Sequence, residues 1–225
     1  FLLKTKIDFI KIPSGEITNF PLLEYIKKSN KKILLSTGAS TLSEVKTALK
    51  ILNKKKKEIT VLQCNSAYPT PIKHLNLNTL TTFRKKFNCE VGLSDHSLSV
   101  VAAAAAVSLG ATIIEKHFTL SRDMIGPDHK SSLEPSELKR MIQNIREIES
   151  ALGNFNKNIT KSERENRRII RKSLVANNFI KKGQKFTSKN IFAKRPAGGI
   201  SPMNIKKILG KKAKKNFELD EMIKI

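Results

Sequence analysis

EVGLSDHSLSVVAAAAAVSLGATIIEKHFT, residues 90–119, is the stretch of sequence that decides the fold. A short apolar segment leads to His96, an alanine-rich segment stops at Gly110, and a second apolar segment leads to His117. This alternation predicts a strand, a helix and a second strand, and a glycine just past the last helical residue is typical of a helix end. The stretch therefore predicts a parallel βα unit.

The same pattern recurs on the amino-terminal side of this stretch. Three more apolar segments end in polar or glycine-containing clusters, at residues 8–16, 32–38 and 60–68. Helices are predicted from Glu44 to Leu52, with Ser or Thr available as N-cap, from 98 to 109, and from Pro135 to Leu152. A (β/α)8 barrel and an open doubly wound sheet both gather their polar strand ends at one face. Five units without a GxGxxG motif favour the barrel, and since a full barrel takes about 250 residues, residues 1–153 predict only part of one.

The character of the sequence changes after Gly153. Residues 154–172 are polar and charged and are interpreted as a linker with room for one helix. Residues 173–225 have short apolar segments, a Lys-Gly turn at 182–183 and a loop rich in Pro and Gly at 195–202. We expect a separate small domain there, mixed in structure and mostly β.

Composition narrows the class of protein. The chain has 225 residues, 39% of them hydrophobic, and a formal net charge of +24. The lysines are spread over the chain, for example at 54–57, 181–182 and 211–212, so a solvated surface is favoured over nucleic-acid binding. No apolar run approaches the roughly 18–20 residues that span a bilayer, and Cys64 and Cys89 form neither a metal motif nor a disulfide framework. We therefore expect no membrane span and a reducing, cytoplasmic location.

Two histidines fall at equivalent strand ends. Strand side chains alternate between faces, so Gly92, Ser94 and His96 share one face and Glu115 shares one with His117. Two neutral imidazoles at a barrel rim, with positions left for water and substrate, predict a divalent-metal site. The alternative is a pair of histidines that only form hydrogen bonds within the rim.

Other polar residues at the strand ends are candidates for substrate contacts. Lys11 with the hydroxyls of Ser14, Ser36 and Ser94 is suited to a phosphate or carboxylate, although ordinary helix capping is the better explanation of each serine taken singly. Glu16 and Asp128 are candidates for acid/base or sugar-hydroxyl roles, with a plain turn at 125–128 as the alternative for Asp128. The remaining histidines, His74 and His129, are expected at the surface.

Taken together, several strings resemble the sialic acid synthase family, which comprises N-acetylneuraminate, legionaminate and pseudaminate synthases. They occur in the family's order, and the last resembles its carboxyl-terminal antifreeze-like (SAF) domain. The matching strings are KIPSGE at 11–16, STGAS at 36–40, LQCNSAYPTP at 62–71, GLSDHS at 92–97, EKHFTL at 115–120, GPDHKSS at 126–132 and KRPAGGISP at 194–202.

The resemblance implies an α/β fold: a partial (β/α)8 TIM barrel, strands 4 to 8, followed by a small β-rich SAF domain. It implies a C–C bond-forming transferase that condenses phosphoenolpyruvate with an N-acetylated amino-sugar aldehyde, of the N-acetylmannosamine type, to a nonulosonic acid and phosphate. The first three strands would lie outside this chain, so an inactive fragment is one alternative. Legionaminate or pseudaminate synthesis from a 2,4-diacetamido sugar is another.

Site residues carry over position by position. His96 and His117 match the metal ligands, with Mn²⁺ expected and Mg²⁺ the alternative. Glu16 matches the catalytic carboxylate. Matches to phosphoenolpyruvate contacts are Lys11, Ser14, Ser36 and Ser94, and matches to sugar contacts are Tyr68 and Asp128, with Ser66 where N-acetylneuraminate synthases tend to have Asn. Arg195 matches an arginine inserted into the partner's site, which implies a domain-swapped homodimer.

Overall fold

The computed structural model describes residues 5–55 and 58–225. Two lysines of the 54–57 run, Lys56 and Lys57, lie outside the described residues. The chain divides into two compact units, residues 1–154 and 155–225, and each is described by itself.

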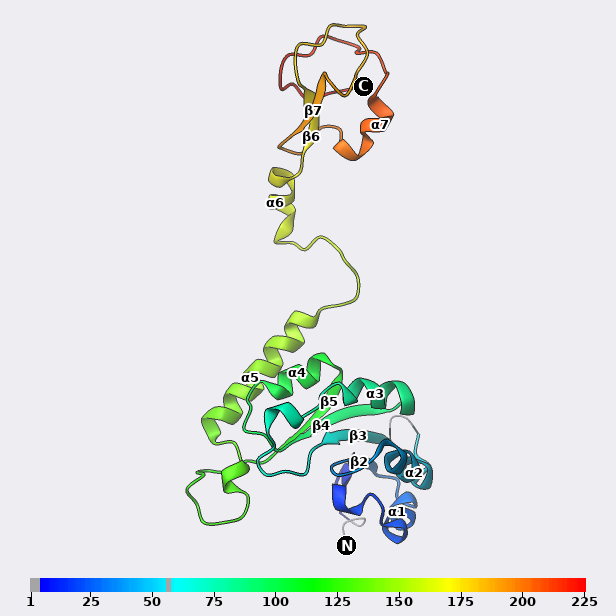
Figure 1. The fold of residues 1–225 in the computed structure, drawn as a ribbon, viewed down its shortest axis with the longest axis vertical. Helices are drawn as coiled ribbons and strands as arrows, with labels where there is room; N and C mark the ends of the chain where they lie inside the picture. Colours follow the sequence, from blue (N-terminus) through cyan, green and yellow to red (C-terminus); the bar gives the residue numbers. More distant parts are fainter. Residues whose placement is uncertain (1–4, 56–57) are drawn as a thin grey trace. The chain divides into compact units, whose positions relative to one another are not determined.

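The first unit is a five-stranded parallel sheet with helical crossovers (Figure 1). Its strands are β1 (Phe9–Ile12), β2 (Lys32–Ser36), β3 (Ile59–Cys64), β4 (Glu90–Asp95) and β5 (Ala111–Lys116). Its α-helices are α1 (Phe20–Lys27), α2 (Leu42–Leu52), α3 (Thr79–Phe87), α4 (Ala102–Ser108) and α5 (Pro135–Leu152). Short 3-10 turns occur at Ser14–Glu16, Ile72–His74 and His129–Ser131.

The sheet curls as a half-barrel. Its strand order, β1-β2-β3-β4-β5, follows the chain without the reversal that a doubly wound sheet requires. Lys11 in β1 forms an ion pair with Glu115 in β5, with an N–O distance of 2.6 Å. In a flat sheet four strand spacings would separate these strands by roughly 19 Å, so the contact requires strong curvature. The predicted partial TIM barrel is confirmed, and the doubly wound alternative is excluded.

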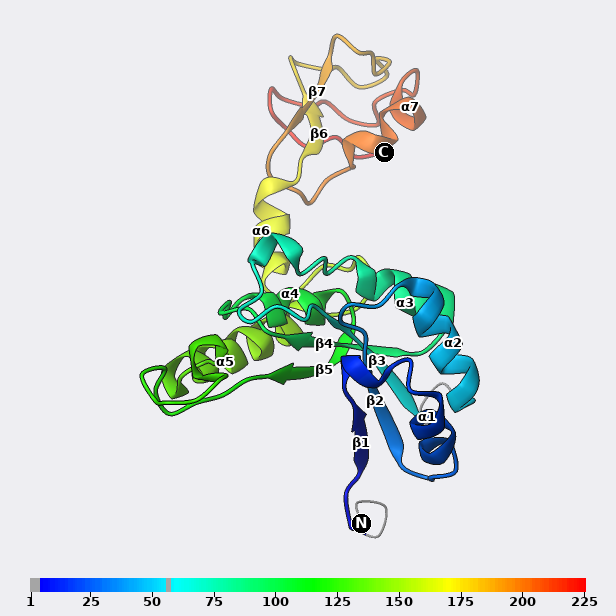
Figure 2. The ribbon, with the colours of Figure 1, turned by 60° about the horizontal axis from the view of Figure 1, so that its bottom comes forward.

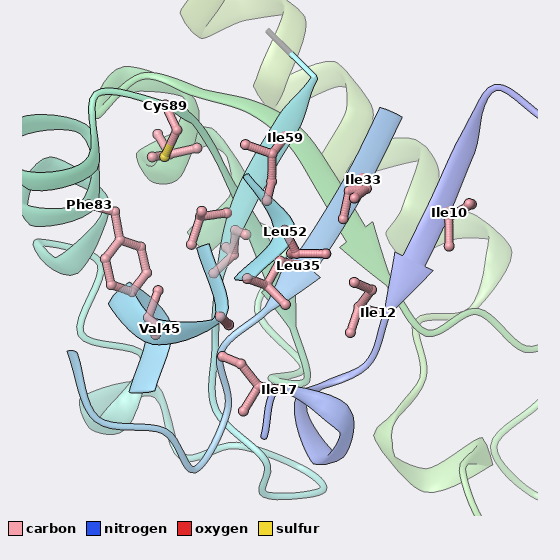
Figure 3. Packing of buried hydrophobic residues seen from close by; sticks show 14 of the residues in the cluster. Ile10, Ile12, Ile17, Ile33, Leu35, Val45, Leu52, Ile59, Phe83 and Cys89 are labelled. Atoms are coloured by element: carbon pink, nitrogen blue, oxygen red, sulfur yellow. The ribbon is translucent and has the colours of Figure 1, made fainter. Parts of the chain in front are cut away.

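The outer face of the sheet forms the main hydrophobic core with the helices. Figure 3 shows Ile33 and Leu35 of β2 in one packed layer with Val45 and Leu52 of α2 and Phe83 of α3. In Figure 2, helices α1 to α3 lie along one side of the strands. Each fully buried Leu or Ile contributes roughly 1.5–3 kcal/mol. The strand residues of this face are apolar because they meet helices along their whole length.

Local signals explain where the helices begin and end. Thr41 and Glu44 form a reciprocal capping box at the start of α2. Helix α5 begins with Pro135 and ends before Gly153, as expected. Helix α4 begins at Ala102, four residues later than the predicted start at Leu98. The reason is Ser99, whose hydroxyl accepts hydrogen bonds from the backbone of residues 101 and 102.

The second unit is small and has its own core. It contains α6 (Glu163–Ile170), β6 (Ser173–Ala176), β7 (Ile191–Lys194), the 3-10 turn Pro202–Asn204 and α7 (Ile205–Ile208). Strands β6 and β7 pair antiparallel, and isolated bridges such as Ile180–Phe217 extend the β character. Its core includes Leu174, Phe186 and Phe217, each at most 1% exposed. Every residue from 155 to 172 is exposed, and α6 lies within this segment.

Candidate functional site

The inner face of the curled sheet becomes polar where its strands end. The alternation that sends Ile33 and Leu35 outward turns Ser36 inward, and the same rule applies to the neighbouring strands. Cys64, Ser94 and Glu115 lie in register across β3, β4 and β5. Hydroxyl, thiol and carboxylate groups from three strands therefore form one row on this face.

The two predicted metal-binding histidines lie together just beyond this row, two residues further along the chain than Ser94 and Glu115. His96 directly follows β4 and His117 directly follows β5, with ring centroids 5.2 Å apart. The Tyr68 ring lies against both, with centroids 4.3 Å from His96 and 5.8 Å from His117. Tyr68 itself is 53% exposed, so it lies between the imidazole pair and solvent.

Hydrogen bonds orient His96 from two sides. Its Nδ1 lies 2.8 Å from the carbonyl oxygen of Asn65, so Nδ1 donates and the neutral ring carries its lone pair on Nε2. Its backbone carbonyl accepts a 3.0 Å hydrogen bond from the Thr70 N–H. A ligand histidine typically donates its second ring nitrogen to such a carbonyl. Asn65 and Thr70 thus position His96; both lie within the string at 62–71, but only the structure shows their role.

The histidine pair fits a shared divalent cation. With metal–nitrogen distances of about 2.1 Å and a ligand angle of roughly 90–110°, two imidazole centroids would lie about 4.6–5.3 Å apart, and the observed 5.2 Å is within that range. Within residues 5–55 and 58–225, no group of three or more His, Cys, Asp or Glu side chains could hold a metal. If a cation is bound here, His96 and His117 would be its protein ligands, and water or substrate would fill the other positions.

Cys64 and His96 alter each other's proton affinity. Burial alone would raise the pKa of the Cys64 thiol, but hydrogen bonds with His96, Ser14 and Ser94 together lower it. Burial would lower the pKa of His96, yet hydrogen bonds with Cys64 and the Asn65 carbonyl raise it. The Cys64 Sγ lies 4.0 Å from His96 Nδ1. The thiol is therefore part of the polar row, and its role depends on contacts between strands that no local pattern predicts.

A second cluster, suited to an anion, lies on β1 and β2. The Ser36 hydroxyl is buried and has no hydrogen-bond partner in the described part of the chain. The Ser14 hydroxyl accepts a 2.9 Å hydrogen bond from the Gly38 N–H. Lys11 Nζ donates to Glu115 Oε1 at 2.7 Å and lies 2.6 Å from Oε2 without hydrogen-bond geometry. A buried hydroxyl without a partner is unfavourable unless a ligand completes it.

Ser66 lies beside the same cluster because residue 38 has no side chain. A Cβ at Gly38 would lie 2.2 Å from Ser66 Oγ and 2.9 Å from Ser14 Oγ. Only a residue without a side chain allows these two hydroxyls to approach so closely. The Gly in the STGAS segment was noted as part of a string, and its steric role is visible only in the structure.

The remaining predicted site residues are Glu16, Asp128 and Arg195, and none of them belongs to the two clusters described above. The Glu16 carboxylate accepts a 2.5 Å hydrogen bond from Asn19. Asp128 is exposed, but its charge acts on the site: burial, then the negative charges of Cys64, Asp128 and Glu115, raise the pKa of Tyr68. Arg195 is exposed in the second unit.

The two histidines expected at the surface differ. His74 is exposed. His129 is half-buried, and its Nδ1 lies 2.7 Å from the Thr119 hydroxyl.

Fold and site define a (β/α)-barrel protein with a polar site at the carboxyl ends of its strands, followed by a small β unit. The chain belongs to the NeuB family, whose model matches residues 1–157, and a SAF domain matches residues 171–225.

Curated relatives align with most of the length of this chain. The chain is 49% identical over 221 residues to the N,N'-diacetyllegionaminic acid synthase of Campylobacter jejuni serotype O:2, covering 97% of this chain and 66% of that protein. It is 39% identical over 215 residues to the pseudaminic acid synthase of C. jejuni serotype O:23/36, covering 95% and 62%. The chain thus spans slightly less than two thirds of the length of these relatives.

A solved structure has the same architecture. The putative spore coat polysaccharide biosynthesis protein E of Chromobacterium violaceum superposes with a TM-score of 0.79 at 26% identity, covering 96% of this chain and 66% of that one. In the described part of our chain, no helix is both long and apolar enough to cross a membrane.

Proposed function

We propose that the protein containing this chain condenses phosphoenolpyruvate with an acylated amino-sugar aldehyde to give a nonulosonic acid and phosphate. The observation that carries the proposal is the adjacent pair His96 and His117, with ring centroids 5.2 Å apart, beside an anion-suited cluster that contains the unpartnered hydroxyl of Ser36. Family membership and the names of the two synthase relatives support the same reaction class.

The chain's own residues would bind the two substrates at neighbouring positions. His96 and His117 would hold Mn²⁺, or Mg²⁺ as the alternative, and this ion would supply Lewis-acid polarisation of the aldehyde. The phosphate and carboxylate of phosphoenolpyruvate would be bound by the ammonium of Lys11 and the hydroxyls of Ser14, Ser36 and Ser94. For Lys11 this requires sharing or exchanging its present partner, Glu115.

The reaction follows from bringing the two carbon centres together. C3 of phosphoenolpyruvate attacks the aldehyde carbon, water adds at C2, and phosphate leaves by C–O cleavage. Glu16, in the turn after β1, is the proposed acid/base group. Holding both substrates in contact removes much of the entropic part of the activation free energy of the condensation.

A 2,4-diacetamido sugar is the favoured aldehyde. The 49% identity to a protein named for N,N'-diacetyllegionaminic acid supports it, and so does Ser66, which stands where N-acetylneuraminate synthases tend to have Asn. Tyr68 and Asp128 are the other proposed sugar contacts, and Tyr68 already lies over the histidines. An N-acetylmannosamine-type sugar is the second candidate.

The second unit is proposed to complete the site of a partner subunit in a domain-swapped homodimer. Arg195 is exposed, and its guanidinium fork suits an acylamino carbonyl or sugar hydroxyls. Mixing the full-length Arg195→Ala and Glu16→Gln proteins should restore part of the activity, because some heterodimers contain one intact composite site. No restoration in heterodimers that demonstrably form would contradict action across subunits.

The reaction is tested with the full-length protein, phosphoenolpyruvate, Mn²⁺ and a panel of 2-acetamido and 2,4-diacetamido sugars, with phosphate release as the signal. We expect release only with sugar and metal together, and loss of most of it in His117→Ala while the circular dichroism spectrum is unchanged. Unchanged turnover and unchanged Mn²⁺ binding in His117→Ala would remove the metal assignment. Absence of phosphate release across the panel would remove the proposed reaction.

A further inference from the structure

A buried ion pair lies directly behind the two histidines. Asp95 is the last residue of β4 and Lys116 the last residue of β5, and they are register partners. Lys116 Nζ lies 2.7 Å from Asp95 Oδ2, and the side chains are 4% and 0% exposed. Each residue immediately precedes one of the histidines, so by strand alternation the pair projects from the opposite face.

The pair also binds the backbone that follows His96. The Ser97 N–H donates to Asp95 Oδ1 at 2.8 Å, and the Ser97 carbonyl accepts a hydrogen bond from Lys116 Nζ. Both backbone polar groups of Ser97 are therefore held by side chains at the ends of β4 and β5. The β4–β5 register ends at Asp95 and Lys116, so the histidines lie one residue beyond the last paired positions.

Fold stability does not account for charges at this place. Removing two ions from water carries a desolvation penalty that their attraction often fails to offset, and well-packed apolar residues of similar size usually stabilise a protein as well or better. The preceding outward positions of β4, Val91 and Leu93, are indeed apolar and at most 1% exposed. What the ion pair supplies and an apolar pair does not is directional bonding between the two strand ends.

We propose that Asp95 and Lys116 are positioning residues that set the separation of His96 and His117 and thereby the affinity for the divalent cation. The inference rests on the proposed function, because it presupposes that the histidines bind a metal. The cross-strand bond fixes the spacing of the two strand ends, and the bonds to Ser97 fix the backbone around His96. Without them, the fold persists but the imidazoles lose their fixed spacing.

The test compares two double variants of the full-length protein that differ in the cross-strand hydrogen bond. Both Asp95→Asn/Lys116→Met and Asp95→Asn/Lys116→Gln remove both charges, so neither leaves an unpaired buried ion. Only the second keeps a hydrogen-bond donor on residue 116 for the amide oxygen at position 95 or the Ser97 carbonyl. Mn²⁺ binding is measured as a Kd from the electron paramagnetic resonance signal of free Mn²⁺, alongside the midpoint of thermal unfolding.

We expect the methionine variant to remain folded and to bind Mn²⁺ roughly 10–100-fold more weakly, the range typical when outer-shell partners of metal ligands are removed. The glutamine variant should recover most of the affinity. The matched control is Glu24→Gln/Lys27→Leu, which removes an exposed ion pair on α1 and should leave the Kd unchanged.

The outcomes separate this inference from the proposed metal site. Wild-type protein that binds no Mn²⁺ refutes the metal site itself. Wild-type binding with an unchanged Kd in the folded methionine variant refutes the positioning role alone. A Kd that rises equally in both double variants also refutes it, because the cross-strand hydrogen bond would then be irrelevant. If the methionine variant does not fold, a glutamine variant with wild-type stability but weakened binding gives the same refutation.

Discussion

The two faces of the half-barrel sheet differ in the interactions that their buried residues make. On the outer face of β2, Ile33 and Leu35 are 0% exposed and pack against helices. On the inner face of the same strand, Ser36 is equally buried but has no hydrogen-bond partner in the described residues. Neighbouring positions in one strand thus differ: Ile33 and Leu35 pack in the core, whereas the Ser36 hydroxyl is left available to a ligand. The unpartnered hydroxyl of Ser36 is therefore a sign of function that the apolar residues on the outer face of β2 do not give.

The largest expected effect is a loss of stability caused by a substitution on the outer face. Leu35→Ala should lower the free energy of unfolding by about 2–5 kcal/mol, because it removes buried methyl groups and leaves a cavity among the helices. Urea unfolding of the full-length protein measures this. At saturating phosphoenolpyruvate and sugar, the folded fraction should turn over at the wild-type rate; a specific loss of turnover in a stable variant would contradict the division between faces.

One residue further along, Ser36→Ala should have the opposite profile. Its stability should be unchanged or slightly higher, since an unpartnered buried hydroxyl is removed. Binding of phosphoenolpyruvate should weaken by about 1.5–3 kcal/mol, roughly 10–100-fold in KM, the range for a hydrogen bond to a charged group. Parallel urea unfolding and steady-state kinetics test both halves. A variant that is destabilised but binds normally would show that Ser36 is merely structural.

Gly38→Ala should sharpen the comparison at the edge of the site. The added methyl would meet the hydroxyls of Ser66 and Ser14, and moving Ser14 away would weaken the hydrogen bond that its hydroxyl accepts from the N–H of residue 38. We expect a cost of about 1–3 kcal/mol, seen mainly as a higher KM for substrates. Gly15→Ala is the control, because nothing lies within 4 Å of a Cβ there. Equal kinetic effects of both substitutions would contradict the steric explanation.

The smallest effect concerns an ion pair in the helical layer. The hydrogen bond from Arg122, followed by one from the Glu134 N–H, lowers the pKa of Glu137. Because the folded-state pKa is lowered, this contribution to stability is present above the unfolded pKa near 4.5 and is lost as pH falls through the folded value. Partial exposure limits it to less than about 1 kcal/mol. Glu137→Gln should therefore flatten the dependence of the melting temperature on pH below 5; an unchanged slope would assign that dependence to other carboxylates.

The strands of the first unit could be predicted because their signal is local. Segments such as 90–96 and 112–119 each consist of an apolar run with a polar end. The observed strands β4 and β5 begin within one residue of the first residue of these segments. The alternation of side chains within each segment also predicted which residues share the inner face. The start of α4 was missed, because the hydrogen bonds of Ser99 depend on the turn that precedes the helix.

The candidate site also has features that the sequence predicts and features that only the tertiary structure determines. From the sequence alone, His96 and His117 could be assigned to equivalent strand ends, since period-two alternation and parallel pairing are properties of the chain itself. The tertiary structure decided how far apart they lie, that Tyr68 covers them, and that Lys11 reaches Glu115 across the interior. These facts depend on the curvature of the sheet and on contacts between residues as many as 104 positions apart. Local patterns specify the strands and their faces, whereas distances across the interior arise only when all five strands pack together.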